Sequence, residues 1–263
     1  MRTKVLTGVV ISIAFILIAW FAPAAVLAAL VVVACAVGAL EMVRLCGEVR
    51  SAPLAVVLSA IVPLGAWFYG TWGMLFAVAF GVCAIALKAA TSGRDPAGIV
   101  SEAKALAVCI LFCGLLFAMW IPVVLVSQQA GYSNWIFWAP AGIWSNDIGA
   151  YFGGRFLGKR RLSRLSPKKT VEGLIAGSIT STLFFFIVGN FTALGPWWGL
   201  ILGVLVSVLA PVGDLFESAF KRAAGAKDSG ALFPGHGGVL DRTDSILASA
   251  PAVLFVLKLK LGF

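Results

Sequence analysis

Long runs of apolar residues, each about 15 to 22 residues in length, leave this chain few folds to choose from. Hydrophobic residues make up 61% of the chain and charged residues only 12%, and the mean hydropathy is +1.02. Such runs are typical of helices that cross a bilayer, because a helix satisfies its backbone N–H and C=O groups internally. The chain is therefore predicted to be an all-α, polytopic integral membrane protein. About nine transmembrane helices are expected, at residues 5–21, 24–43, 53–71, 73–89, 105–126, 135–151, 173–191, 195–213 and 244–261.

The connections between these runs alternate between charge-free and basic segments. Loops near residues 22, 72, 127–134 and 192–196 contain no Lys, Arg, Asp or Glu, and the intervening connections contain nearly all of them. Because basic loops stay in the cytoplasm, the pattern places the N-terminus and both large polar loops inside and the C-terminus outside. The net charge of +9 is attributed to this topology and to contact with anionic membrane lipids, so no nucleic-acid partner is expected.

The two halves of the chain differ in polarity. Residues 1–130 are predicted to be transmembrane scaffold helices with almost no polar groups in their spans. Residues 131–263 are predicted to carry a cytoplasmic-facing site within the same continuous membrane domain. In the first half, Glu41 and Arg44 lie three residues apart at a helix end and are expected to form a surface ion pair.

Charge is concentrated between residues 214 and 244, which contain five of the eleven acidic residues and the only histidine. Ionisable groups near a bilayer are costly, and where they gather they mark a pathway or a reaction centre. The stretch is expected to begin as a helix, since one helical face would carry Asp214, Glu217, Ser218, Lys221 and Arg222.

A glycine-rich loop around His236 follows this helix, and Asp241-Arg242-Thr243-Asp244 opens the next helix. A single histidine cannot form a multi-histidine metal site, so acid–base catalysis, a phosphate hydrogen bond and loop shaping all stay open for His236. Carboxylates on two helices, with basic groups and glycine N–H groups between them, can hold a divalent cation and a polyphosphate together.

A second polar region begins at the cytoplasmic end of the span 135–151, where Asn146 and Asp147 are interpreted as facing a polar cavity. In the loop that follows, Thr170 is expected to be the N-cap of a helix beginning at Val171. A helix N-terminus preceded by two lysines suits a phosphate. The predicted substrate-binding residues of this region are Asn146, Asp147, Ser166, Lys168, Lys169, Thr170 and Glu172. The nearby run with Lys159, Arg160, Arg161 and Arg164 is expected to be unstructured and to lie on anionic lipid.

These charged segments resemble a known family. The C-terminal signature of the phosphatidate cytidylyltransferases, the CDP-diacylglycerol synthases, is matched by Ser218, Lys221-Arg222, Lys227-Asp228, Pro234-Gly235-His236-Gly237-Gly238 and Asp241-Arg242-Thr243-Asp244. The upstream stretches DIGAYFGGRFLGK and SPKKTVEG are also similar to that family. Phe220 replaces a usual leucine, and Ile148 replaces a common threonine and so removes a hydroxyl group. The motifs cover roughly residues 145–245.

The resemblance implies transfer of CMP from CTP to phosphatidic acid, giving CDP-diacylglycerol and pyrophosphate, in phospholipid biosynthesis at the inner (plasma) membrane. It implies Mg²⁺ held by Asp214 and Asp241, with Asp228 and Asp244 as further candidate ligands, and an additional monovalent cation is left open. The implied catalytic residues are Lys221, Arg222, Lys227, His236 and Arg242, and Ser218, Gly237 and Gly238 are implied to bind substrate. The expected partners are CTP, phosphatidic acid of the inner leaflet and membrane lipids, with a homodimer left open.

Two alternatives stay beside this hypothesis. The same chemistry on another lipid phosphate, as in the CDP-archaeol synthases, would need the same charged residues. A transporter would use intramembrane charges to line a path, but here the charges gather at one face and no inverted repeat is visible.

Overall fold

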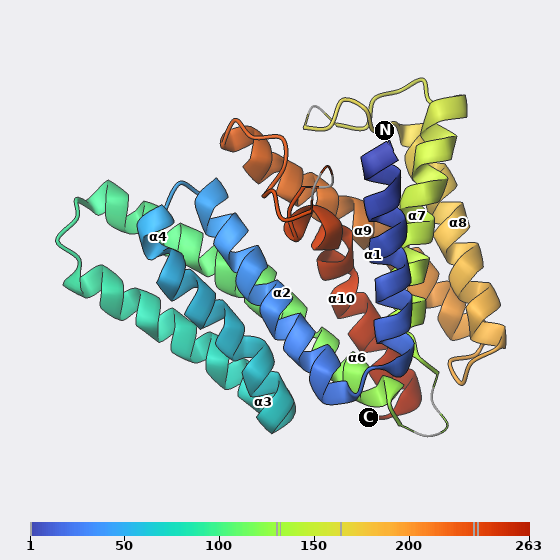
Figure 1. The fold of residues 1–263 in the computed structure, drawn as a ribbon, viewed down its shortest axis with the longest axis horizontal. Helices are drawn as coiled ribbons and strands as arrows, with labels where there is room; N and C mark the ends of the chain where they lie inside the picture. The colour runs from blue at the N-terminus through green and yellow to red at the C-terminus, as the bar shows by residue number, and fades with distance from the viewer. Residues whose placement is uncertain (1, 130, 132, 164, 234, 236) are drawn as a thin grey trace. The chain divides into compact units, whose positions relative to one another are not determined.

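The structure is a computed structural model of residues 1–263 that describes all residues except 1, 130, 132, 164, 234 and 236, with side chains from residue 12 onward. It belongs to the all-α class, as predicted (Figure 1). The long helices are α1 (Arg2–Phe21), α2 (Ala24–Leu45), α3 (Ala52–Thr91), α7 (Trp135–Leu157), α8 (Val171–Asn190), α9 (Pro196–Ala223) and α10 (Leu240–Leu261). Between α3 and α7 a further helical path consists of α4 (Pro96–Val108), the π-helix η2 (Cys109–Leu115), α5 (Leu116–Ala118) and α6 (Trp120–Ser127), and the 3-10 turn η1 (Val49–Ser51) precedes α3.

The expected count of nine transmembrane helices is wrong. The described part of the chain forms eight long helical segments, of which five are long and apolar enough to cross a bilayer. These are Ala24–Leu45, Val49–Thr91, Pro96–Ser127, Val171–Asn190 and Pro196–Ala223. Of the other three, α7 and α10 carry polar or charged side chains within their length, and the part of α1 with described side chains is a shorter apolar helix, Ser12–Phe21. Five such helices still make this a multi-pass membrane protein.

The two spans expected at residues 53–71 and 73–89 belong to one helical element, α3. The chain turns at Gly70, whose φ of 59° and ψ of −143° lie in a region that glycine adopts readily. A Cβ atom added to Gly73 would lie 2.1 Å from the carbonyl oxygen of Gly65, so the two arms of α3 approach each other at backbone distance. The boundary that the sequence pattern placed between residues 71 and 73 is therefore close to a real turn, although α3 is counted as one helical element.

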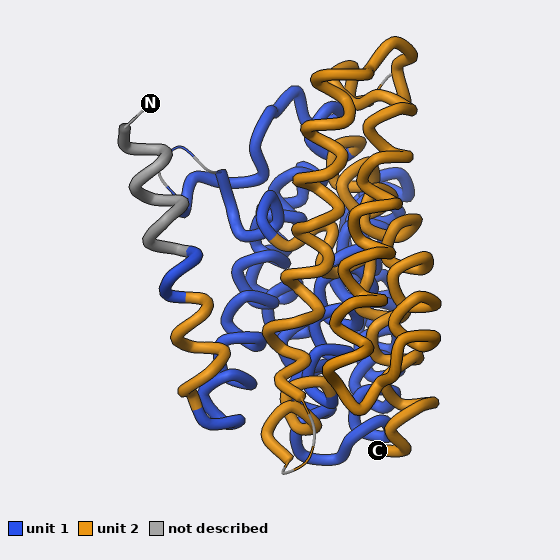
Figure 2. The backbone as a smooth tube through the Cα atoms, turned by 90° about the vertical axis from the view of Figure 1, so that its right-hand side faces the viewer, with its two compact units in different colours: residues 1–14, 23–122, 220–242 blue, residues 15–22, 123–219, 243–263 orange. Residues whose placement is uncertain are grey.

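The chain divides into two compact units, each assembled from segments that are distant in sequence (Figure 2). Unit 1 contains residues 1–14, 23–122 and 220–242, and unit 2 contains residues 15–22, 123–219 and 243–263. The expected division into residues 1–130 and 131–263 stays a prediction.

Unit 1 is built around an apolar core in which α2, α3 and the π-helical segment pack together. Leu58, Val62, Ile110 and Ile121 are almost completely buried there. Burial of a side chain of this size stabilises the fold by about 1.5–3 kcal/mol relative to an exposed position in water. Charged groups of the unit lie outside this core, at the ends of α2, α3 and α4 and in residues 220–242.

Unit 2 depends on close packing of α7, α8 and α9 through small residues. A Cβ atom on Gly153 would lie 2.2 Å from the Cβ of Ala176, and one on Gly203 would lie 2.5 Å from the Cα of Thr182. Glycines at these positions therefore let α8 approach both neighbouring helices, as is common between helices in membranes. The glycines of α7 and α9 therefore bring both helices close to the backbone of α8.

Candidate active site

The most connected side chain of the motif region is the carboxylate of Asp241, in the first turn of α10 within unit 1. Its Oδ1 atom accepts a hydrogen bond of 2.7 Å from Lys221 Nζ. Its Oδ2 atom accepts from the backbone N–H groups of Ser229 (2.7 Å) and Gly238 (2.8 Å) and lies 2.9 Å from the Ser229 hydroxyl. The side chains of Lys221 and Asp241 are only 10% and 6% exposed, so this is a buried ion pair.

These contacts determine the charge state of Asp241. Burial by itself would raise the pKa of this carboxyl, since it disfavours the charged form. The hydrogen bonds from Lys221, Gly238 and Ser229 favour the ionised form and outweigh burial, so the pKa lies below its ordinary value. Asp241 is therefore a carboxylate at neutral pH and can attract a cation or hold a lysine in place.

Glu41, in α2, contacts the glycine-rich loop that precedes α10, through Ser229, Val239 and Leu240. This residue is only 4% exposed, and the expected surface pair with Arg44 is wrong. Its Oε1 accepts from the N–H of Val239 (3.0 Å), and its Oε2 accepts from the N–H of Leu240 and the hydroxyl of Ser229 (both 2.9 Å). This contact could not be predicted from local sequence, because 198 residues separate Glu41 from Val239.

Two glycines of the motif are required by close approach. Gly237 has a φ of 84°, and a Cβ atom there would lie 2.4 Å from Oδ2 of Asp241. A Cβ atom on Gly238 would lie 2.3 Å from Oε1 of Glu41. Any larger residue at these positions would push a carboxylate away from the loop. The predicted substrate contacts of Gly237 and Gly238 stay predictions.

Asp214, in α9, occupies a comparable environment within unit 2. It forms an ion pair with Lys169 and accepts a hydrogen bond of 3.2 Å from the Ser218 hydroxyl one turn further along the helix. The side chains of Asp214 and Lys169 are 31% and 28% exposed, so solvent reaches both. Lys169, in the polar turn before α8, thus contacts the Asp214 carboxylate of α9.

The turn before α8 is ordered by its own hydrogen bonds. Thr170 is the N-cap of α8, as predicted, and its Oγ1 accepts from the N–H of Gly173 at 3.1 Å. Lys169 donates its N–H to the carbonyl of Ser166 at 3.0 Å, while Lys168 is exposed. A backbone carbonyl and a capped helix therefore fix the position of Lys169.

The expectation of an unstructured basic run at Arg160 and Arg161 is wrong. Arg161 forms an antiparallel bridge with Thr170, and the N–H of Val171 donates to the carbonyl of Arg160 at 2.9 Å. Glu172 accepts from the N–H groups of Lys159 (3.0 Å) and Arg160 (3.1 Å) and from Nε of Arg160 (3.1 Å). The acid in the first turn of α8 thus closes the loop, and its predicted substrate contact stays a prediction.

The remaining predicted residues differ in their exposure. Asn146 is 1% exposed and its Nδ2 lies 3.4 Å from the Ser181 hydroxyl, whereas the neighbouring Asp147 is exposed. Arg222 is exposed and donates to the carbonyl of Ala226 at 2.9 Å. Lys227, Asp228 and Arg242 are exposed, and Asp244 is half-buried. His236 and Pro234 lie outside the described residues.

The fit of a divalent ion can be judged from the carboxylates. An ionised carboxylate has about four lone-pair sites. Asp214 receives two donors, which leaves room for a metal. Asp241 keeps one site only when the single hydrogen of the Ser229 hydroxyl points to Glu41 instead. Among the described side chains, no three His, Cys, Asp or Glu residues gather as a ready ligand set. A Mg²⁺ ion would therefore complete its coordination with substrate phosphates and water, as it commonly does.

A second charged cluster, which sequence reasoning missed, lies in unit 1 where η1, α3 and α4 meet. Arg94 donates to Glu48 at 2.8 Å and to Glu102 at 3.3 Å. Glu102 also pairs with Lys88 at 3.2 Å and accepts from the hydroxyl of Ser51. Both glutamates are buried, so the cluster holds the ends of three segments together. From the sequence alone, these residues look like the charged residues of any basic cytoplasmic loop.

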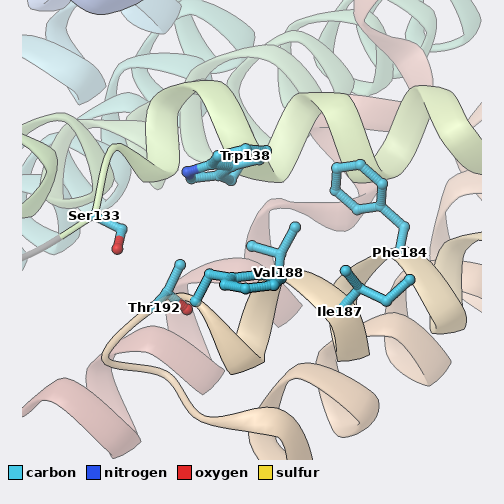
Figure 3. Close-up of a pocket in the computed structure, with 7 residues that line it drawn as sticks. Ser133, Trp138, Phe184, Ile187, Val188 and Thr192 are labelled. Carbon is cyan, nitrogen blue, oxygen red and sulfur yellow. The ribbon is translucent and has the colours of Figure 1, made fainter.

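Two cavities lie away from these carboxylates. One, in unit 2, has a volume of about 340 Å³ and is lined by Trp138, Phe184, Val188 and their neighbours (Figure 3). Its lining residues carry no charge, and Ser133 and Thr192 place it beside the charge-free loops, so it offers no group for phosphate chemistry. The other, in unit 1, has a volume of about 960 Å³ and is mostly apolar, with Lys104 and Cys46 in its wall.

Comparison with known proteins gives a consistent picture. The model of the cytidylyltransferase family matches residues 2–260. A phosphatidate cytidylyltransferase from Mycobacterium bovis is 35% identical over 289 aligned positions, which cover 98% of this chain and 89% of that protein. One from Bacillus subtilis is 39% identical over 70% of this chain and 67% of that protein. One from Synechocystis is 49% identical over 45% of this chain, but the match spans only 41% of that relative's length.

Proposed function

The chain belongs to the cytidylyltransferase family, and we propose that it transfers CMP from CTP to phosphatidic acid, forming CDP-diacylglycerol and releasing pyrophosphate. The observation that carries the proposal is the buried ion pair of Asp241 and Lys221 beside a glycine-rich loop at the start of α10. The similarity to proteins named phosphatidate cytidylyltransferase supports the choice of nucleotide and lipid.

The residues present suit an in-line phosphoryl substitution. A phosphate oxygen of phosphatidic acid attacks the α-phosphorus of CTP, the bond from that phosphorus to the bridging oxygen breaks, and pyrophosphate leaves with the electron pair. The nucleophile is already an anion, so no Ser, Cys or His nucleophile of the protein is needed. Catalysis then requires positioning of the two substrates and neutralisation of the repulsion between two anions.

Basic side chains of the motif are the proposed source of that neutralisation. Lys168, Lys227 and Arg242 are exposed, so solvent and substrate can reach their charged groups. Lys169 and Lys221 are held by Asp214 and Asp241, so their ammonium groups are presented in fixed positions. We assign Lys168 and Lys169 to substrate phosphate, and Lys221, Arg222, Lys227, His236 and Arg242 to the reacting groups.

Mg²⁺ is the proposed cofactor, with Asp214 and Asp241 as its carboxylate ligands. When bound, it supplies positive charge to the phosphates of CTP. The lone pairs left on Asp214, and on Asp241 when Ser229 donates to Glu41, support this assignment. Asp228 and Asp244 are weaker candidates for the same role.

The proposed location of the site is the cytoplasmic face of the inner membrane, where CTP and inner-leaflet phosphatidic acid are both present. This orientation rests on the distribution of basic residues among the loops.

The proposal is tested with the purified protein in detergent micelles. We expect pyrophosphate release that requires CTP, Mg²⁺ and phosphatidic acid together, and that exceeds the release with archaetidic acid as acceptor. Faster turnover with the archaetidic acid would reassign the lipid substrate. Absence of CTP-dependent pyrophosphate release with either acceptor would refute a cytidylyltransferase.

A further inference from the structure

We propose that Glu41 of α2 is a positioning residue for cytidylyl transfer, which sets the place of Asp241 through Ser229 and the first N–H groups of α10. This inference rests on the proposed function for its kinetic consequence, while its structural part stands on the contacts alone. Glu41 lies in the half of the chain that the sequence assigned to scaffold, and its side chain contacts Ser229, Val239 and Leu240. It acts on the loop that carries Asp241.

The first argument is the geometry of the cap. The N–H groups of the first turn of a helix have no partner within the helix, and a side-chain oxygen is needed to accept them. For α10 the acceptor is Glu41, which takes the N–H groups of Val239 and Leu240 at 3.0 and 2.9 Å. A carboxylate at a helix N-terminus is also favoured by the helix dipole. Asp241 follows Leu240 directly, so fixing the cap fixes the start of the segment that carries Asp241.

The second argument is the bridge through Ser229. The Ser229 hydroxyl lies 2.9 Å from Oε2 of Glu41 and 2.9 Å from Oδ2 of Asp241. Because a hydroxyl has one hydrogen, it can donate to only one of these carboxylates at a time. When it donates to Glu41, a lone pair on Asp241 is left for another ligand. Glu41 thus affects both the place of Asp241 and the number of donors that Asp241 receives.

The third argument is that the loop leaves room only for this carboxylate. A Cβ atom on Gly230 would lie 2.5 Å from Oε1 of Glu41, and one on Gly238 would lie 2.3 Å from the same atom. Two glycines, one hydroxyl and two N–H groups therefore surround a side chain that is 4% exposed. Among the described residues, the hydrogen-bond partners of the Glu41 side chain are all donors on the loop or at the start of α10.

A glutamine at position 41 would not reproduce this arrangement. Its single carbonyl oxygen can replace one carboxylate oxygen, but its NH₂ group would face an N–H donor of Val239 or Leu240. One of these N–H groups would then be buried without an acceptor, which destabilises the start of α10. An aspartate would keep both oxygens but on a side chain shorter by one methylene. E41D is therefore the conservative variant, and E41Q the disruptive one.

The matched control is Glu102→Gln. Glu102 is another buried glutamate of unit 1, and its described partners, Lys88, Arg94 and Ser51, all lie outside the motif loop. Loss of stability alone should therefore appear in both E41Q and E102Q. An effect that depends on the place of Asp241 should appear only in E41Q.

The test combines hydrogen–deuterium exchange with kinetics on the full-length protein in micelles. In E41Q we expect faster exchange of the amides of residues 229 and 238–241, and a fall in kcat of about 100-fold, as a misplaced reacting group can cause. KM for CTP should change little, because Glu41 is only 4% exposed and is proposed to act through Asp241. E41D should recover part of kcat, and E102Q should keep both kcat and the exchange pattern of this loop.

Three results would overturn the proposal. Unchanged exchange at residues 238–241 in E41Q would show that Glu41 does not hold the loop. Faster exchange with unchanged kcat would show a cap without a positioning role. Equal falls of kcat in E41Q and E102Q would attribute the effect to stability.

If E41Q does not fold, the variant S229A tests the same link. It should lower kcat while the amides of Val239 and Leu240 keep their protection from exchange, and an unchanged kcat would refute the bridge through Ser229. Wild-type protein without any CTP-dependent activity would refute the proposed function separately, since the exchange result does not depend on it.

Discussion

Replacing Asp241 by asparagine should cost more stability than a change of one atom suggests. The asparagine oxygen can take the place of Oδ2 and accept the N–H groups of Ser229 and Gly238. Its NH₂ group then faces Lys221 Nζ, which in the wild type lies 2.7 Å from Oδ1. Two donors would meet at this point, and the ammonium group of a lysine side chain that is only 10% exposed would lose its carboxylate.

The magnitude follows from burial of the pair. Removal of one partner from a buried ion pair typically costs about 3–5 kcal/mol, because the other charge is left uncompensated. Removal of both charges costs much less, since similar-sized neutral groups are often tolerated. We therefore expect D241N to lower the free energy of unfolding by about 3–5 kcal/mol, and the double variant K221M/D241N to be more stable than D241N alone.

The assay is unfolding of the purified protein in micelles, with wild type, K221M, D241N and the double variant compared under the same conditions. The two single changes should be strongly non-additive, with a coupling energy of at least about 1 kcal/mol for residues in direct contact. Turnover should be lost in all three variants. The double variant should therefore regain stability relative to D241N without regaining activity. Additive losses, or a D241N protein as stable as wild type, would refute the buried ion pair.

Three further outcomes are expected. Alanine at both Lys168 and Lys169 should lower turnover much more than alanine at both Arg160 and Arg161, measured as pyrophosphate release, and equal losses would indicate that only bulk charge matters. D214N should slow turnover by about 10²–10³-fold, as loss of a transition-state stabiliser does, and added Mg²⁺ should restore part of it; near-normal turnover at limiting Mg²⁺ would refute the metal assignment. The hydrogen bond from Arg94 lowers the pKa of Glu48 in the folded protein. The ionised Glu48 therefore stabilises the fold fully above the ordinary glutamate pKa range, and this stabilisation should be lost as the pH falls below about 4, measured by unfolding at a series of pH values. An E48Q protein with the same acid sensitivity as wild type would contradict this.

Local sequence patterns predicted the parts of the structure that depend on neighbours in the chain. The start of α8 at Val171 and its cap at Thr170 follow from residues within one helical turn. The continuation of α9 through Lys221 and the start of α10 beside Asp241 follow from helical spacing and from the glycines between them. In each case the determining interaction spans only a few residues, so the pattern is visible without the fold.

The errors came from interactions that connect distant segments. Glu41 was expected at the surface because its partners, Ser229 and Val239, lie almost two hundred residues away. The cluster of Glu48, Arg94 and Glu102 brings together three segments whose charges looked like separate basic-loop residues. Apolar length fixes the class of the protein, but it does not reveal which polar groups meet.

The motif residues fall into two sets that differ in how they are held, and this difference separates their expected effects. Lys221, Asp241 and Gly238 are buried among partners of the loop, so substitutions there should change stability and turnover together. Lys168 and Lys227 are exposed, and a change to alanine removes charge with little loss of packing. If the exposed set binds phosphates, its alanine variants should fold with wild-type stability and yet release pyrophosphate slowly. Because both sets belong to the motif residues of the family, only measurement of stability beside turnover can show which residues build the site and which act on the substrate.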